Sequence, residues 1–383
     1  MNFTKTAVIA SIVSATFAIS GAVQADGMPK KTAWTAYGTT SSGYAQAVSI
    51  GNMMKKHYGT NMRVIPGKND ISRMTPLRDN KAGYCACGIA AYFGQEGVFI
   101  FADKKWGPQP IRLLMTNIGS FGLSLATAKD AGIKTMADMK GKRVSWVQGA
   151  PALNWNVSAQ LAFAGLTWDD VQKVKVSGFA ASFDAIKNGQ SDAAFSSTVS
   201  SSPKKLAASP RGLHWVPVPH DDAAGWKRMS AAAPVYGKVK ATLGSEIDKK
   251  NPPHLSNYPY PILVANASWD ANEVYSIVKA MVDHYDDYKL AAKGALGWKL
   301  DNQNMKWAMP YHSGAIKYFK EAGKWDASTQ KHQDMLVGRQ AVIKKAWDGL
   351  SGKDSMEKAA LKAAWGPVRV AALKAAGLPA IFK

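Results

Sequence analysis

Two strand–loop–helix units, near residues 31–56 and 142–165, constrain the fold of this chain more than any other feature of its sequence. In each unit an apolar strand pattern enters a glycine-containing loop, and residues at helical spacing follow at once. Strand and helix patterns alternate elsewhere too, which favours an α/β fold with largely parallel sheets. We therefore predict two α/β lobes, each containing one such unit.

The first unit begins with the strand pattern KTAWTAYG (31–38) and the loop YGTTSSG. A helix follows, with one face formed by Tyr44, Ala47, Val48, Gly51 and Met54. MRVIPG (62–67) and GYCACGIA (83–90) predict two more strands, joined by a helical link over 71–80. IRLLMTNIG (111–119) then leads into a strand that crosses to the other lobe.

The second unit contains the strand in GKRVSWVQ (141–148) and a helix that starts in GAPALNWN (149–156). The stretch KNPPHLSNYPYPI (250–262) is rich in proline and tyrosine, and we expect it to run between the lobes over the surface. A helical pattern follows from residue 268, with Ser268 or Asp270 as its N-cap.

The N-terminus reads as a cleaved secretory signal over residues 1–25. Lys5 precedes an apolar run over 7–20, and Val23 and Ala25 stand at the small positions that signal peptidase requires. Export argues against nucleic acid as a partner for a chain of net charge +21. The charge then indicates an electropositive cleft that attracts organic anions, or a basic surface that faces a membrane or a partner.

Residues 338–383 form a basic tail with nine Lys/Arg against three Asp/Glu. The pattern predicts two amphipathic helices split near SGKDS (351–355). Two interpretations stay open. The tail packs on a lobe with a solvated outer face, or it offers a basic face to anionic lipid or a membrane partner.

The two cysteines, Cys85 and Cys87, form a C-x-C pair. On a strand both sulfurs point to one face, but the small ring would strain a disulfide. Two thiolates alone also make a poor metal site, and no CxxC or HxxxH lies nearby. We therefore expect two buried, small apolar cysteines, and a redox or metal role is the less favoured alternative.

Catalytic and nucleotide-binding patterns are absent from the sequence. Tyr44 and Ala45 stand where a P-loop needs Lys and Ser/Thr, and there is no G-x-G-x-x-G or G-x-S-x-G. No HExxH or paired metal spacing occurs among the histidines, which stand at 57, 214, 220, 254, 284, 312 and 332. We expect no catalytic residue, metal or cofactor, and an enzyme is the weaker class.

The opening loop remains a binding candidate. Free backbone N–H groups at a helix start suit a carboxylate, together with the hydroxyls of Thr39, Thr40, Ser41 and Ser42. A hydroxyl-rich N-cap that binds nothing is the alternative.

Six segments in order resemble the TAXI branch of the periplasmic solute-binding subunits of TRAP transporters. They are YGTTSSGYA (37–45), LRDNKAGYCACGIAAYFGQEG, KTMADMKGKRV, LAFAGLTWDDV, FDAIKNGQSDAAF and AMPYHSGAIKYFKEAG, which together span roughly residues 32–325. The resemblance implies a type II periplasmic-binding-protein fold, whose two α/β lobes close on a small organic acid or amino acid in the interlobe cleft. The basic tail lies outside it.

The resemblance also implies ligand-binding positions in the first lobe. Thr39 and Ser42 fall on the family's loop threonines, and Tyr44 falls on its second tyrosine. Cys87 falls where the family usually has glutamine, and Gly88 where it has serine, so a glutamate-like ligand is less favoured.

In the second lobe, Pro151 and Leu153 replace the serine and threonine of the family's PGSGT loop. Because proline has no N–H to donate, we expect other donors: Gln148, Asn154 or Asn156. Ser197 and Thr198 fall in a further cleft loop. Trp146 and Trp155 pack in the lobe core, or they line the cleft and accept an apolar or aromatic part of the ligand.

The sequence thus predicts a periplasmic receptor that delivers a small organic anion to TRAP membrane permease subunits. The expected parts are the signal (1–25), lobe 1 (26–118 and 251–337), lobe 2 (119–250) and the tail (338–383). Two other functions stay open: an exported two-lobed enzyme acting on a small acid, and a surface protein that acts through its basic tail.

Overall fold

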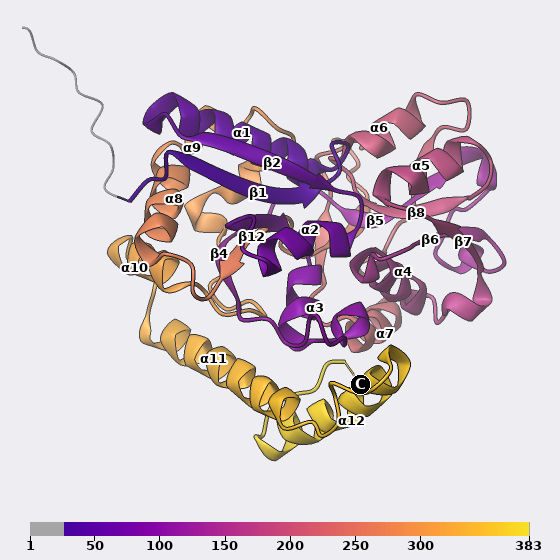
Figure 1. Ribbon diagram of the computed structural model, residues 1–383. Helices are drawn as coiled ribbons and strands as arrows, with labels where there is room; N and C mark the ends of the chain where they lie inside the picture. The colour runs from indigo at the N-terminus through magenta and orange to yellow at the C-terminus, as the bar shows by residue number, and fades with distance from the viewer. Residues whose placement is uncertain (1–26, 383) are drawn as a thin grey trace, which may run out of the picture.

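The computed structural model describes residues 27–382, which form two α/β lobes and a helical C-terminal segment (Figure 1). The predicted signal sequence lies outside the described residues. Each lobe is built on a five-stranded sheet, with the strand orders β2-β1-β3-β12-β4 and β7-β6-β8-β5-β9. The prediction of a two-lobed α/β fold with a helical tail is confirmed.

Lobe 1 comes from two stretches of the chain. The first stretch contains β1 (Lys31–Tyr37), α1 (Ser42–Tyr58), β2 (Asn61–Gly67), α2 (Asp70–Arg78), β3 (Tyr84–Cys87), α3 (Ala90–Glu96) and β4 (Ile111–Thr116). The second contains β12 (Ile262–Asn266), α8 (Ala271–Asp283), α9 (Tyr285–Tyr288) and α10 (Ser313–Glu321).

Lobe 2 is formed by the chain between these stretches. Its sheet and helices are β5 (Leu123–Ala128), β6 (Arg143–Val147), α4 (Pro151–Phe163), β7 (Gln172–Val176), α5 (Phe179–Lys187), β8 (Ala193–Ser197), α6 (Ser201–Ala207), β9 (Leu213–Trp215) and α7 (Ala223–Ala232). A two-stranded sheet joins β10 (Gly237–Lys240) to β11 (His254–Asn257).

Both sheets are mixed, so the prediction of largely parallel sheets is wrong at two strands. β1 runs parallel to β2 and β3, and β6 runs parallel to β7 and β8. β12 and β5 run antiparallel to both of their neighbours. Each of these two strands enters its sheet from the other lobe, so it is not bound to the parallel direction that a crossover within one sheet imposes.

The two strand–loop–helix units, β1–α1 and β6–α4, occupy the same position in their sheets. Helix α1 starts at the N-cap Ser41 and ends at Gly59, whose φ of +68° favours glycine. Helix α4 starts with Pro151, where the missing N–H costs no helical hydrogen bond. Different residues therefore start equivalent helices.

Two segments cross between the lobes and are hydrogen-bonded to each other. Tyr260 N donates to Asn117 O at 2.8 Å, and Asn117 N donates to Pro261 O at 3.2 Å. The segment 250–262 does connect the lobes, but the expectation that it runs over the surface is wrong for its second half. Leu255, Tyr258 and Tyr260 are buried because β11 and the segment after it pack between the lobes.

The tail contains α11 (Ala327–Asp348) and α12 (Lys358–Ala375), two helices as predicted, although the first begins well before Gly338. They share a small core formed by Ala102, Ile343, Trp347, Leu361, Trp365 and Leu373. Figure 1 shows α11 lying along lobe 1 and α12 turning back beneath α3 and α7. Within residues 27–382, none of the helices combines the length and apolar character of a membrane span.

Candidate functional site

A cavity of about 30 Å³ lies between the lobes and has room for roughly two water molecules. Its wall is mostly aromatic and aliphatic. The polar side chains in the wall are one arginine, one asparagine, three serines and three tyrosines: Arg73, Asn156, Ser196, Ser197, Ser200, Tyr37, Tyr258 and Tyr260. Both lobes contribute to this wall, as a solute-binding cleft requires.

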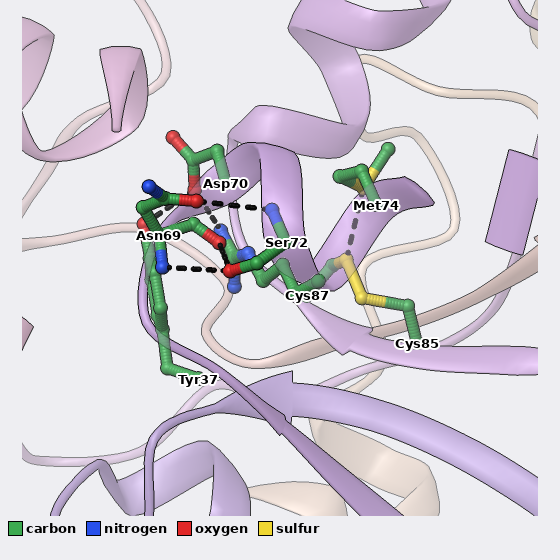
Figure 2. The surroundings of a disulfide bond; sticks show 8 residues. Tyr37, Asn69, Asp70, Ser72, Met74, Cys85 and Cys87 are labelled. Carbon is green, nitrogen blue, oxygen red and sulfur yellow. Dashed lines mark hydrogen bonds and ion pairs between the residues drawn. A yellow bond between two sulfur atoms is a disulfide. The ribbon is translucent and has the colours of Figure 1, made fainter. Parts of the chain in front are cut away.

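Among the residues that the structure describes, Arg73 is the only charged one in the cavity wall, and its side chain is 1% exposed. It lies on α2, which begins with a reciprocal capping box between Asn69 and Ser72 (Figure 2). Its Nη2 donates to Asp70 Oδ1 at 2.8 Å, and its Cζ lies 3.7 Å from the centre of the Tyr37 ring. Its Nε and Nη1 have no hydrogen-bond partner among residues 27–382.

These two unpartnered nitrogen atoms matter because buried N–H donors are almost always hydrogen-bonded. Burial alone would lower the pKa of Arg73, but Tyr37 and Asp70 outweigh burial and raise that pKa. The guanidinium therefore stays charged. A buried cation with spare donors in a closed cavity can bind an anion through charge-assisted hydrogen bonds.

Asp70 connects the two lobes. Its Oδ1 accepts from Arg73 and from the Tyr37 hydroxyl, and its Oδ2 accepts from the backbone N–H of Ala152 at 2.8 Å. Burial raises the pKa of Tyr37 well above its usual value, so the Tyr37 hydroxyl keeps its proton and donates it. The Asp70 carboxylate thus accepts a hydrogen bond from the Ala152 backbone N–H at the start of α4. The sequence predicts a ligand at this end of α4.

Further hydrogen bonds hold the lobes together. Asp70 N donates to Gly149 O at 3.0 Å, and Phe179 N donates to Lys68 O at 3.1 Å. Ser42 N donates to Ser200 Oγ at 3.2 Å, and Ser201 N donates to Thr40 O at 3.0 Å. The structure is therefore a closed form.

The opening loop mainly caps α1 and connects lobe 1 to lobe 2. Ser41 Oγ accepts from Tyr44 N at 3.3 Å as the N-cap of α1, and the Ser42 amide is used by Ser200. Thr39 is exposed. The Tyr44 side chain lines an outer groove between α1 and β2 instead of the interlobe cavity. Neither Thr39, Ser41, Ser42 nor Tyr44 belongs to the cavity wall.

Cys87 is bonded to Cys85 in a disulfide (Figure 2), so the expectation of two separate cysteines is wrong. Their Cα atoms are 5.1 Å apart, which lies inside the range that a disulfide spans. Both sulfurs do lie on one side of β3, where Cys87 Sγ is 3.4 Å from Met74 Sδ. Both cysteines are fully buried and lie outside the cavity wall.

The predicted donors of lobe 2 are mostly used within the protein. Gln148 is exposed, its backbone N–H donates to Val176 O at 2.9 Å, and its backbone carbonyl oxygen accepts from Asn69 Nδ2 at 3.1 Å. The Asn154 amide group bonds both backbone groups of Val147. Thr198 Oγ1 accepts from Gly122 N and donates to Leu243 O.

Ser197 and Asn156 do lie in the cavity wall. The Asn156 side chain donates to the Tyr258 hydroxyl at 2.9 Å and accepts from the Tyr236 hydroxyl at 2.8 Å. Ser197 Oγ has only a long contact of 3.5 Å with Val199 N, so its hydroxyl is the freer of the two donors.

Trp146 and Trp155 do not line the interlobe cavity. They line a separate cavity of about 260 Å³ beside α4, together with Trp168, Phe99 and Lys362 of the tail. The Trp146 ring packs on Trp168 with centroids 4.8 Å apart, and Trp155 packs on Phe93 at 5.4 Å. This second cavity also lies between the lobes, because Phe99 belongs to lobe 1 and α4 belongs to lobe 2.

Sequence reasoning missed Arg73, Asp70 and Tyr37. Arg73 follows Asp70 at the i,i+3 spacing of neighbours on a helix face. That spacing predicts the ion pair but not its burial, which depends on β1 and α4 packing against it.

Several solved structures resemble this chain at low identity. The alkanesulfonate-binding protein SsuA from Xanthomonas axonopodis pv. citri bound to MOPS is 12% identical, with a TM-score of 0.43 over 80% of this chain and 83% of that chain. An ancestral arginine-binding protein bound to arginine is 14% identical, with a TM-score of 0.43 over 68% and 94%. A periplasmic binding protein of an ABC transporter from Brucella ovis with glutathione bound is 11% identical, with a TM-score of 0.42 over 69% and 70%.

The match to a family model is more extensive. The model of the NMT1-like family matches residues 35–323, which contain nearly all of both lobes and end before α11 and α12 of the tail. This range contains α2, α4 and the end of β1, which position Arg73, Ala152 and Tyr37. The match covers well over half of the chain. This chain therefore belongs to the NMT1-like family.

Proposed function

We propose that this chain is a solute-binding protein that captures a small organic anion between its lobes and delivers it to a membrane permease. One observation carries the proposal: the Arg73 guanidinium lies in the wall of the interlobe cavity with Nε and Nη1 unpartnered. Leaving buried charged donors unpaired costs free energy. An anionic guest in the cavity removes that cost.

The chemistry of the wall supports a carboxylate as the guest. Arg73 supplies the charge, Ser197 and Ser200 supply hydroxyls from lobe 2, and aromatic rings cover an apolar part. In this closed form the cavity admits a guest of only a few heavy atoms. A larger guest requires the lobes to lie further apart.

The two crossing segments near Asn117 and Tyr260 support a hinge. A guest bound to Arg73 on one side and to the serines of lobe 2 on the other favours the closed form, because it contacts both lobes only there. A permease can then distinguish the loaded from the empty receptor. The resemblance to the TAXI branch supports a permease of the TRAP type.

The disulfide between Cys85 and Cys87 supports an exported, periplasmic location. Disulfides persist in oxidising compartments and are rare in the cytosol. The secretory pattern of residues 1–25 gives the same location.

A thermal-shift screen of small acids tests the proposal. It compares acetate, other short carboxylates, sulfonates and the neutral amide of each acid. We expect one acid to raise the melting temperature by several degrees and its amide to do nothing. The matched variant carries Asp70→Asn with Arg73→Gln, which keeps the buried network neutral while removing the cation.

In this double variant, affinity for the acid should fall at least tenfold, because hydrogen bonds to charged groups contribute about 1.5–3 kcal/mol. An unchanged affinity would show that the anion binds elsewhere. A flat response of the native protein to every acid, with no small molecule detected by mass spectrometry after denaturation, would reject the receptor function.

A further inference from the structure

Two histidines and an aspartate meet on the outer face of lobe 1, away from the interlobe cavity. One potential ligand atom from each of His57, His284 and Asp287 lies within 4.8 Å of the other two. His57 is in the last turn of α1, and His284 joins α8 to α9. Asp287 follows His284 by three residues in α9. We call these three residues the His57 cluster.

The two imidazole rings are stacked. Their centroids are 3.6 Å apart and their planes differ by 13°. Two protonated rings would repel each other at this distance. Neutral imidazole is the form that binds a metal ion.

Each of the His284 and Asp287 side chains also has an outer partner. The Tyr58 hydroxyl is 3.0 Å from His284 Nε2, a contact that fixes the orientation of the ring. Lys56 Nζ donates to Asp287 Oδ1 at 2.9 Å, while Asp287 Oδ2 contacts His57 Nε2. Outer partners of this kind orient ligands in metal sites.

We propose that the His57 cluster binds a divalent transition-metal ion of the Zn²⁺ class, with His57, His284 and Asp287 as its protein ligands. Two imidazoles and one carboxylate suit such an ion and leave a fourth position for water. The His57 and Asp287 side chains are 26% and 32% exposed, so an ion can enter from solvent. The bound ion would tie the end of α1 to the junction between α8 and α9.

Lys56 is the one feature that opposes a cation here. Its side chain is 63% exposed, so it can leave Asp287 and extend into water when the ion enters. The proposal therefore predicts that replacing Lys56 by a neutral residue strengthens metal binding.

The chain also contains a control pair. The rings of His220 and His254 are stacked in the same way, with centroids 4.1 Å apart and planes differing by 10°. His220 Nε2 is 3.0 Å from Leu255 O, and His254 Nδ1 accepts from His220 N. Within residues 27–382, no carboxylate completes this pair into a comparable group.

Titration calorimetry with Zn²⁺, and visible absorption with Co²⁺, test the proposal on protein without an oligohistidine tag. We expect one ion per chain for the native protein and for His254→Gln. His57→Ala, His284→Ala and Asp287→Asn should each weaken binding at least tenfold, and Lys56→Gln should tighten it several-fold. Zn²⁺ should also raise the melting temperature of the native protein and leave that of His57→Ala unchanged.

Absence of binding to the native protein would overturn the proposal. So would equal affinity in the native protein and His57→Ala, or equal losses in His57→Ala and His254→Gln. Because the cluster lies at the surface, all variants should keep the metal-free melting temperature of the native protein. Asp287→Asn, which preserves shape, decides the result if an alanine variant fails to fold.

Discussion

Two clusters of buried charge, one between the lobes and one between lobe 1 and the tail, differ in how fully their arginines are partnered. In the tail cluster, Glu96 accepts from Arg339 at 2.7 and 2.8 Å and from Arg369 at 2.6 Å. The remaining Nη1 of each arginine donates to a carbonyl, that of Pro379 or of Phe382. Every side-chain nitrogen of both arginines has a partner.

In the interlobe cluster, by contrast, Nη2 is the only Arg73 nitrogen with a hydrogen-bond partner in the described part of the chain. Both clusters are almost completely buried, so exposure does not explain the difference. A cluster that only holds structure together satisfies its own donors, as the tail cluster does. The spare donors of Arg73 are the basis of the proposed guest site, and the following experiments test this contrast.

The largest effect should follow from Glu96→Gln. This change leaves two buried guanidiniums facing a neutral amide, and breaking a buried ion pair typically costs 3–5 kcal/mol. We expect a loss of about 5 kcal/mol in the free energy of unfolding, measured by urea denaturation. Asp348→Asn, which removes the exposed pair with Lys344, is the matched control and should change little.

Asp70→Asn should cost about 3 kcal/mol, because it leaves one buried arginine without its carboxylate and weakens the bond to Ala152. Added small carboxylates should affect the stability of the two variants differently. They should restore part of the lost stability of Asp70→Asn, since a cavity adjoins Arg73, and none of that lost by Glu96→Gln. Equal rescue of both variants would remove the distinction between the clusters.

The smallest effect concerns an exposed charge at the start of the tail. Asp326 caps α11 by accepting from Thr329 N at 2.6 Å, and hydrogen bonds from Thr329 and Ser328 lower the pKa of Asp326 to about 2. Because the folded-state pKa is depressed, this stability is present above an unfolded pKa of about 3.9 and is lost as the pH falls through about 2.

The comparison is with Asp326→Asn, which keeps an acceptor but has no charge. The difference in melting temperature between the native protein and this variant should shrink as the pH falls from about 5 to about 2. A constant difference over that range would mean that the carboxylate charge contributes nothing to the cap.

Local patterns predicted much of the fold because they depend on neighbouring residues. The apolar runs of β1 and β2 predict strands, and the helical spacing in α1 and α8 predicts helices, without reference to distant residues. The direction of β5 and β12 could not be read in this way, because it depends on which lobe the chain has just left.

The site was harder to predict for the same reason. Ser41 and Asn154 have suitable donors, but local backbone groups use them. Arg73 lies in a segment that reads as a helical link, and only Tyr37 from β1 and the start of α4 make it buried. Residues that gain their role from distant partners leave little trace in a local pattern.

The end of the tail has a consequence for how lobe motion can be observed. Phe382 is held to lobe 1 through Arg369 and Glu96, yet its ring also touches Trp155 of lobe 2, with centroids 6.1 Å apart. Separation of the lobes, as proposed above, would break the contact between the Trp155 indole and the Phe382 ring and expose the indole to more water. We therefore expect Trp155 fluorescence to report the separation of the lobes without an added label. A bulky fusion at the C-terminus should interfere with closure of the lobes.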